Sequence, residues 1–169
     1  ALAPQAVLSR TGLLVLDRHG PRQLRGCLDL LSANFADRMH SETNDILQLL
    51  RGVVQAAPPA QLALEEYPHI QPQLDIALPH LRQASQQGQH GVNFFIHASP
   101  GTGKTEFDRT LAAALGCELF EVASEDSDGD PINAERRLRA LQAAQSFFSQ
   151  RRALLMFDEV EDVFNDSVH

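Results

Sequence analysis

The stretch HASPGTGKTE, residues 97–106, constrains the fold of this chain more than any other feature. It fits the last three places of the pattern G-x-x-x-x-G-K-[ST] with Gly103, Lys104 and Thr105, whereas alanine stands at the first place, position 98. At average residue usage, two glycines, the lysine and the threonine coincide by chance in fewer than about one in a hundred chains of this length. Such loops join a strand to a helix and hold phosphate groups with backbone N–H groups. We therefore predict a phosphate-binding loop.

The alanine at position 98 is compatible with this prediction. The N–H groups that converge on a phosphate belong to the later half of the loop, about residues 101–105. Gly101 and Gly103 stand there, and the lack of a side chain lets the backbone approach a phosphate closely. Position 98 lies where the strand turns into the loop and mainly needs a small residue. We expect the methyl group of Ala98 to be tolerated.

Short apolar runs alternate with helical patterns after residue 58. The runs near 92–97, 117–122 and 153–157 have the length and composition of strands buried in a sheet. A helical pattern follows the loop at 105–116, and another begins near Pro131. The order strand, helix, strand, helix, strand predicts an α/β fold: a three-layer P-loop sandwich with a parallel sheet.

Apolar residues at spacings of three and four define one face on each of three predicted helices. These residues are Leu74, Leu78 and Leu81 over about 71–86, Phe107, Leu111 and Leu115 after the loop, and Leu138, Leu141 and Phe148 after Pro131. Pro79 predicts a kink or an early break in the first of them, because proline cannot donate a helical hydrogen bond.

The first 57 residues predict a small, mainly helical appendage. A short apolar run at 12–17 is compatible with a strand, and amphipathic helical patterns follow at 22–39 and 42–57. Pro58 and Pro59 end the second pattern. We therefore expect the appendage at 1–57, a linker and approach to the nucleotide pocket at 58–70, and the core at 71–169.

An acidic pair directly follows the last apolar run, in the sequence ALLMFDEVED at 153–162. ATPases with such a loop need a carboxylate at a strand end to hold the shell of Mg²⁺, and a base for the attacking water. Asp158 and Glu159 suit these two roles, 54 residues after Lys104. Glu161 and Asp162 are expected to form a solvated acidic turn.

The loop and the acidic pair together resemble the AAA+ ATPases, and the likeness to a group of bacterial AAA-type ATPases covers about 64–166. The resemblance implies that Lys104 contacts the β- and γ-phosphates and serves catalysis, that Thr105 binds Mg²⁺, that Asp158 holds its water shell, and that Glu159 activates the water. It also implies that 67–70 borders the adenine. The implied ATP-binding residues are Ser99, Pro100, Gly101, Thr102, Gly103, Lys104, Thr105, Glu106 and Ile70.

The chain also departs from that family pattern. It ends at DVFNDSVH, before the positions of a sensor strand, an arginine finger and a helical lid, and the stretch 124–133 is acidic where protein-threading members carry an aromatic loop. We therefore expect ATP hydrolysis, coupled to remodelling of a macromolecular partner, in a longer protein assembled as a homo-oligomeric ring. We expect the 169-residue piece to bind ATP or ADP weakly and to hydrolyse ATP very slowly.

Composition and charge limit the binding partners and the cellular location that we expect for this chain. A net charge of −8 argues against nonspecific binding to nucleic acid while leaving room for a local basic patch. No apolar run approaches the length of a bilayer span, so no membrane partner is expected. Two cysteines without a metal or disulfide spacing favour a reducing, cytoplasmic location.

Two other functions remain open at this stage. One is a nucleotide-dependent binding or assembly switch with little turnover, although the presence of Glu159 favours hydrolysis. The other is a phosphohydrolase like the histidine phosphatases, through Arg18, His19 and Gly20, which would need a second histidine and further arginines. The arginines near the last predicted helix are expected to lie on solvated helix faces and ends; they are Arg136, Arg137, Arg151 and Arg152.

Overall fold

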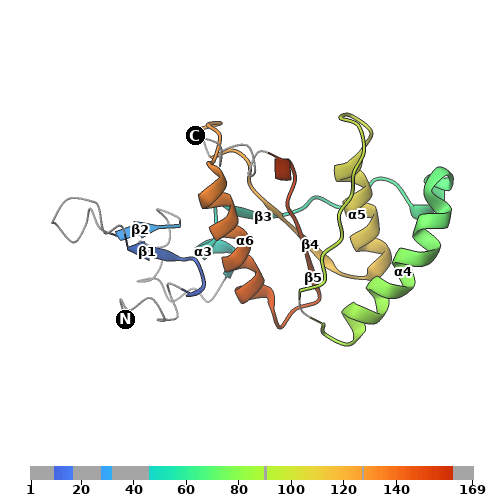
Figure 1. Cartoon of the computed structure of the whole chain (residues 1–169), viewed down its shortest axis with the longest axis horizontal. Coiled ribbons are helices and arrows are strands. Elements are labelled where there is room, and N and C mark those ends of the chain that lie inside the picture. The colour runs from blue at the N-terminus through green and yellow to red at the C-terminus, as the bar shows by residue number, and fades with distance from the viewer. Residues whose placement is uncertain (1–9, 17–27, 32–45, 90, 127, 162–169) are drawn as a thin grey trace. The chain divides into compact units, whose positions relative to one another are not determined.

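A computed structural model describes residues 10–16, 28–31, 46–89, 91–126 and 128–161 (Figure 1). The chain divides into two compact units. The first unit comprises Ala1–Gln55, Glu121–Phe147 and Phe157–His169, and the second comprises Ala56–Phe120 and Phe148–Met156. The fold contains helices and a small sheet, and is therefore α/β.

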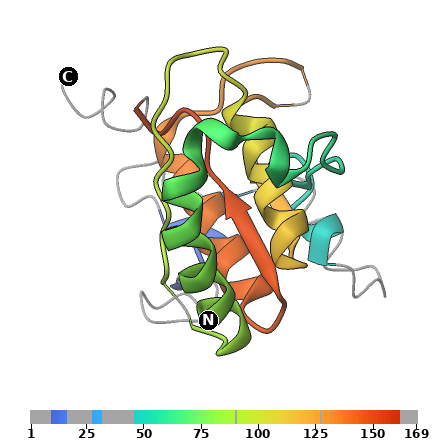
Figure 2. The same ribbon diagram turned by 90° about the vertical axis from the view of Figure 1, so that its right-hand side faces the viewer.

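Two helices dominate the second unit, α4 (Gln71–Gln86) and α5 (Lys104–Leu115). They lie side by side, drawn green and yellow in Figure 2. Their predicted apolar faces meet in one cluster of buried side chains, which are Tyr67, Leu74, Leu81, Phe107, Leu111 and Leu115. Both helices are therefore predicted from the sequence, and burial of their apolar stripes stabilises them.

Helix α4 continues without interruption past Pro79 to Gln86. The early break that the proline predicts does not occur. Leu74 and Leu81 flank Pro79 and are 3% and 9% exposed. Packing on both sides of the proline offsets the hydrogen bond that it cannot donate. None of the helices in the described residues combines the length and apolar surface that crossing a bilayer takes.

Three strands form the larger sheet in the order β3 (Val54–Ala56), β4 (Glu118–Val122) and β5 (Ala153–Met156). The predictions of strands near 117–122 and 153–157 are confirmed. The N–H of Ala57 donates to Leu119 O and that of Ala123 to Val53 O. Residue numbers rise along β3 as they fall along β4, so this pair runs antiparallel. The prediction of a wholly parallel sheet is therefore wrong.

The strand predicted at 92–97 is absent from the structure. These residues form no strand, and Phe94 and Phe95 are 49% and 72% exposed. The sheet order β3-β4-β5 does not include this run. An apolar run is compatible with a buried strand, but only backbone pairing makes one, and this run has no ladder.

The first unit contains a pair of short antiparallel strands, β1 (Leu14–Leu16) and β2 (Leu28–Leu30), in which Leu14 lies opposite Leu30. The helical prediction is wrong at 28–30, while 22–27 and 32–39 lie outside the described residues.

The helix predicted at 42–57 ends earlier than expected, and its residues 42–45 lie outside the described residues. Helix α3 spans Ile46–Leu49, and the N–H groups of Val53 and Val54 then close a turn on the Leu50 carbonyl before β3 begins. Two successive β-branched residues favour the strand. In the described residues, the segment up to position 57 is therefore not mainly helical.

Helix α6 (Ala134–Phe148) confirms the last predicted helix. The side-chain Oδ1 of Asn133 accepts the Arg136 N–H at 2.9 Å, which caps the first turn. Its buried face differs from the prediction, because Leu138 is 47% exposed whereas Ala140, Ala143 and Ala144 are buried. The small side chains, and not the leucines alone, mark the face that packs.

Candidate functional site

The loop before α5 is shaped by two glycines. Gly101 has a φ of 77° and Gly103, the N-cap residue of α5, has a φ of 85°. Only glycine adopts such values without strain. A Cβ atom added at either position would meet nothing within 4 Å. The backbone conformation therefore requires glycine here, and the space beside the loop backbone is open.

Ala98 needs no glycine in its place. Among the described non-glycine residues, positive φ values are confined to Glu159, so Ala98 has an ordinary backbone conformation. Its contribution to the loop is a carbonyl group, which accepts a hydrogen bond from Lys104 Nζ at 3.1 Å. Any residue supplies that carbonyl, and the methyl group takes no part in the contact.

Lys104 folds back across the loop. Its Nζ donates to Ala98 O and, at 3.4 Å, to Ser99 O, while Thr102 Oγ1 donates to the same Ser99 carbonyl at 2.7 Å. The loop thus closes on itself through side-chain donors and backbone acceptors. It places a cation beside the first residues of the loop, where an anion can compete with neutral carbonyl groups for it.

The loop leads into the positive end of α5. The Phe107 N–H donates to Gly103 O at 2.9 Å, and no side chain caps this end of the helix. The first N–H groups of an α-helix have no acceptor within the helix, and the helix dipole adds positive potential there. Loop, lysine and helix end together form a location that favours anionic oxygen atoms.

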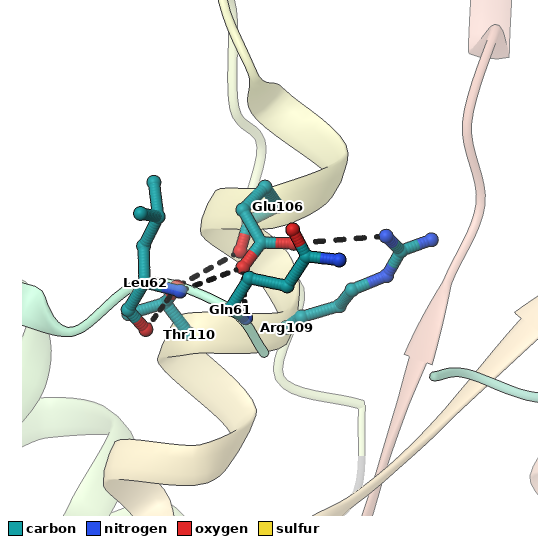
Figure 3. Close-up of polar contacts among 5 residues, drawn as sticks. All are labelled: Gln61, Leu62, Glu106, Arg109 and Thr110. Carbon is teal, nitrogen blue, oxygen red and sulfur yellow. Dashed lines mark hydrogen bonds and ion pairs between the residues drawn. The ribbon is translucent and has the colours of Figure 1, made fainter. Parts of the chain in front are cut away.

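Glu106 joins the first turn of α5 to the linker (Figure 3). Its Oε1 accepts the backbone N–H groups of Gln61 and, at 3.0 Å, Leu62. Thr110 Oγ1 donates to Leu62 O at 3.1 Å, and Arg109 lies 3.6 Å from the carboxylate. The N–H of Gln61 above all, then that of Leu62 and the Arg109 charge, hold the pKa of Glu106 below its ordinary value.

The tether is hard to predict from the sequence, because the groups that donate to the Glu106 carboxylate are backbone N–H groups of an irregular segment. The structure shows that the Glu106 carboxylate faces the linker. The predicted contact of Glu106 with nucleotide therefore rests on its backbone N–H at the helix end.

Two short 3-10 helices precede α4, η2 (Leu64–Glu66) and η3 (Pro68–Ile70). The Tyr67 ring is 8% exposed and meets the Phe107 ring edge-on, with 5.1 Å between centroids. This ring therefore faces the apolar cluster. Ile70 packs against the same cluster and is half-buried. Its contact with adenine stays a prediction.

Asp158 and Glu159 lie just after β5, separated from it by Phe157, and belong to the first unit. The Glu159 N–H donates to Asp158 Oδ1 at 2.9 Å, and Glu159 has a φ of 52°. The Asp158 side chain is half-buried and that of Glu159 is exposed. The acidic pair thus forms a tight turn with one residue in the left-handed region.

A buried arginine holds this turn, which corrects the prediction for Arg137. It is 3% exposed, its Nη2 donates to Asp158 O, and its Nη1 donates to Glu159 O at 3.4 Å. Placing Arg137 on a solvated face overlooked the alanines one turn and two turns further along α6, at positions 140 and 144. They mark the face that Arg137 shares.

The other arginines lie at helix ends and faces. Arg151 is exposed and pairs with Glu118 at 2.8 Å, and the exposed Arg152 donates to Leu115 O at the end of α5. Arg136 is half-buried and donates through Nε to the backbone of the first unit. Arg18, His19 and Gly20, the residues of the phosphatase alternative, lie outside the described residues.

The predicted site residues thus form two local groups. The loop residues from 98 to 106 lie together in the second unit, and the acidic pair lies in the first unit. Within the described ranges, no three His, Cys, Asp or Glu side chains gather as a ready-made metal site.

The comparisons with known proteins bear on the second half of the chain. Residues 94–169 match the family model described as ATPase family associated with various cellular activities (AAA). This range contains both the loop and the acidic pair. Comparison with curated proteins and with solved structures gave no match.

Proposed function

We propose, from the match of residues 94–169 to the family model of AAA ATPases, that this protein binds ATP with Mg²⁺ and hydrolyses it to ADP and phosphate. The observation that carries the proposal is the loop itself. Gly101 and Gly103 adopt positive φ values beside open space, and Lys104 stands at the positive end of α5. The three-layer P-loop sandwich and a core beginning at residue 71 are parts of the same proposal.

Phosphate binding falls to the loop, residues 98–106. Backbone N–H groups of about 101–105 converge on the β-phosphate, because the glycines leave room for it. Lys104 exchanges the neutral carbonyls of Ala98 and Ser99 for phosphate oxygens. Hydrogen bonds between charged groups are about twice as strong as neutral ones, so the exchange favours the nucleotide. Ser99, Pro100 and Thr102 shape the loop, and Ile70 borders the adenine.

Thr105 and Asp158 would hold Mg²⁺. A hydroxyl and a carboxylate are the hard oxygen ligands that this ion prefers, and it commonly completes its shell with water and phosphate oxygens. When bound, the ion neutralises charge on the β- and γ-phosphate oxygens.

Glu159 serves as the base for hydrolysis. Its exposed carboxylate orients a water molecule and accepts its proton as the water oxygen bonds to the γ-phosphorus. The bond from that phosphorus to the β,γ-bridging oxygen breaks, and ADP leaves. Lys104 stabilises the charge that develops on the transferred group. We also propose that the loop and the acidic pair face the same nucleotide.

The proposal extends to assembly and to work on a partner. We infer a homo-oligomeric ring in which a neighbouring copy supplies an arginine to the nucleotide, and ATP hydrolysis that remodels a macromolecular partner. The match of residues 94–169 to the AAA family model supports this extension. The runner-up is a nucleotide-dependent switch with little turnover, and turnover itself separates the two.

Phosphate release by the chain, by a Glu159→Gln variant and by a Glu161→Gln control tests the proposal. Glu161 is an exposed carboxylate two residues away, which makes it a matched control. Glu159→Gln should keep ATP affinity while turnover falls about 10²-fold or more, the contribution of a positioned base. Glu161→Gln should resemble the wild type.

Turnover is measured over a series of chain concentrations, because assembly raises it. Equal turnover of wild type and Glu159→Gln would contradict the assigned base. ATP binding without turnover at any concentration would favour the switch.

A further inference from the structure

The backbone of Glu159 occupies a conformation that its own side chain disfavours. Its φ of 52° lies in the left-handed region, where among the described residues all other positive values belong to glycines. A side chain with a Cβ is strained there, and such residues persist when their surroundings hold them. The hydrogen bond from its own N–H to Asp158 Oδ1 is local. The turn therefore needs a constraint from outside.

Arg137 supplies a constraint of the required geometry. Its two terminal nitrogens donate to consecutive backbone carbonyls, those of Asp158 and Glu159. Its guanidinium carbon also lies 4.5 Å from the centre of the Phe157 ring, so one arginine contacts three successive residues. Arg137 is 3% exposed, and burial strengthens hydrogen bonds by lowering the local dielectric.

The helix that carries Arg137 is fixed on another face. Three side chains at successive spacings of three donate to backbone carbonyls of the first unit: Arg136 to Leu31 O, Arg139 to Gly12 O and Gln142 to Arg10 O, at 3.0, 3.1 and 2.6 Å. Because α6 is anchored along this row, Arg137 has little freedom to follow the acidic turn. The turn follows Arg137.

We propose that Arg137 is a positioning residue for ATP hydrolysis: its two hydrogen bonds hold Asp158–Glu159 in the left-handed turn and thereby aim the Glu159 carboxylate. This inference rests on the proposed function. Arg137 acts through the backbone of Glu159 and touches no substrate. Lysine cannot replace it, because a single ammonium group does not reproduce the planar fork that reaches two carbonyls at once.

A double-mutant cycle tests the coupling without any nucleotide. Urea unfolding is measured for the wild type, Arg137→Lys, Glu159→Gly and the double variant. Glycine adopts a φ of 52° without strain, so the turn in Glu159→Gly no longer depends on the arginine. Arg137→Lys should shift the unfolding midpoint less in the Glu159→Gly background than in the wild type. Equal shifts would overturn the inference, whatever the ATPase activity.

Kinetics separate positioning from mere support of the fold. Arg137→Lys should lower kcat by about 10²-fold, as expected when a reacting group is displaced by about 1 Å, and leave the KM for ATP within about twofold. Arg136→Lys is the control, because Arg136 neighbours it on α6 and also donates to a backbone carbonyl. Its kcat should stay near the wild-type value. An unchanged kcat in Arg137→Lys would reduce Arg137 to a structural role and overturn the inference.

Failure of the proposed function has a different signature. A wild type that binds no ATP or shows no turnover contradicts the proposed function, while coupling in the unfolding cycle would still stand. If Arg137→Lys does not fold, Glu159→Gly and Glu159→Ala decide whether the turn is strained. The glycine variant should then be the more stable of the two, and equal stability would overturn the inference.

Discussion

The loop before α5 and the acidic turn after β5 both rely on left-handed backbone, and they reach it by different means. The loop places glycines where φ is positive, so its shape is encoded at the positions that adopt it. The turn places a glutamate there and takes its shape from Arg137, 21 and 22 residues earlier in the chain. The conformation of the loop can therefore be predicted from its own residues and does not depend on distant ones. The conformation of the turn depends on Arg137, so a substitution at that position of α6 should change it.

Removing the loop's cation should have the largest effect. Lys104→Ala should lower ATP affinity by roughly 10- to 100-fold, because a hydrogen bond to a charged group contributes about 1.5–3 kcal/mol. Isothermal calorimetry measures this directly, and the far-ultraviolet circular dichroism of the variant should match the wild type. Equal affinity of the two forms would mean that the loop does not bind the phosphates.

A methyl group added at a glycine of the loop should destabilise the fold, because the loop depends on its own glycines and not on distant residues. Gly103→Ala should lower the free energy of unfolding by about 1–2 kcal/mol, the strain of a side chain at positive φ. Steric clash adds nothing, since the new Cβ would meet no atom within 4 Å. Urea denaturation checks the value. A stability equal to the wild type would show that the loop changes its conformation at little cost.

The tether beside the loop should make its attachment to the linker depend on pH. The backbone N–H of Gln61, that of Leu62 and the Arg109 charge lower the pKa of Glu106, so the tether stabilises the fold above the ordinary carboxyl pKa. This stabilisation is lost as the pH falls through the lowered pKa. Glu106→Gln should therefore be less stable than the wild type near neutral pH, with a difference that shrinks as the pH falls below the ordinary carboxyl pKa.

Urea unfolding over that pH range gives the measurement. Glu65→Gln, which changes an exposed carboxylate of η2, is the matched control. A pH-independent difference between Glu106→Gln and the wild type would contradict the tether.

The first place of the loop should matter least. Ala98→Gly should change ATP affinity by less than about 1 kcal/mol, because the carbonyl that meets Lys104 remains and no phosphate-binding N–H is altered. Calorimetry under the conditions used for Lys104→Ala makes the two values comparable. A larger gain in affinity would mean that the methyl group obstructs the nucleotide.

The same contrast explains which elements the sequence predicts. Helices α4 and α5 follow from leucine and phenylalanine spacing, and β4 and β5 from short apolar runs, because local burial decides them. The strand predicted at 92–97 does not form, because a strand requires backbone pairing with another segment, which no local pattern reports. Residues 28–30 and 54–56 pair as strands against their helical spacing for the same reason.

In the candidate site, the residue types in the sequence are enough to identify the lysine, the threonine and the acidic pair as candidates. The sequence does not identify the groups that hold Glu106 and the acidic pair, which are Gln61, Leu62 and Arg137. Their contacts join backbone groups to side chains that are distant in sequence.

Chemical labelling of Lys104 tests the central claim most directly, because it is the single lysine in the sequence. An amine-reactive acetylating reagent is applied to the wild-type chain with and without ATP and Mg²⁺, and mass spectrometry follows the extent of modification at Lys104, with the terminal amine as internal reference. We predict that ATP slows acetylation of Lys104 in a saturable manner, while adenosine, which lacks phosphates, has no effect. Acetylation of Lys104 at the same rate with saturating ATP as without it would contradict the account.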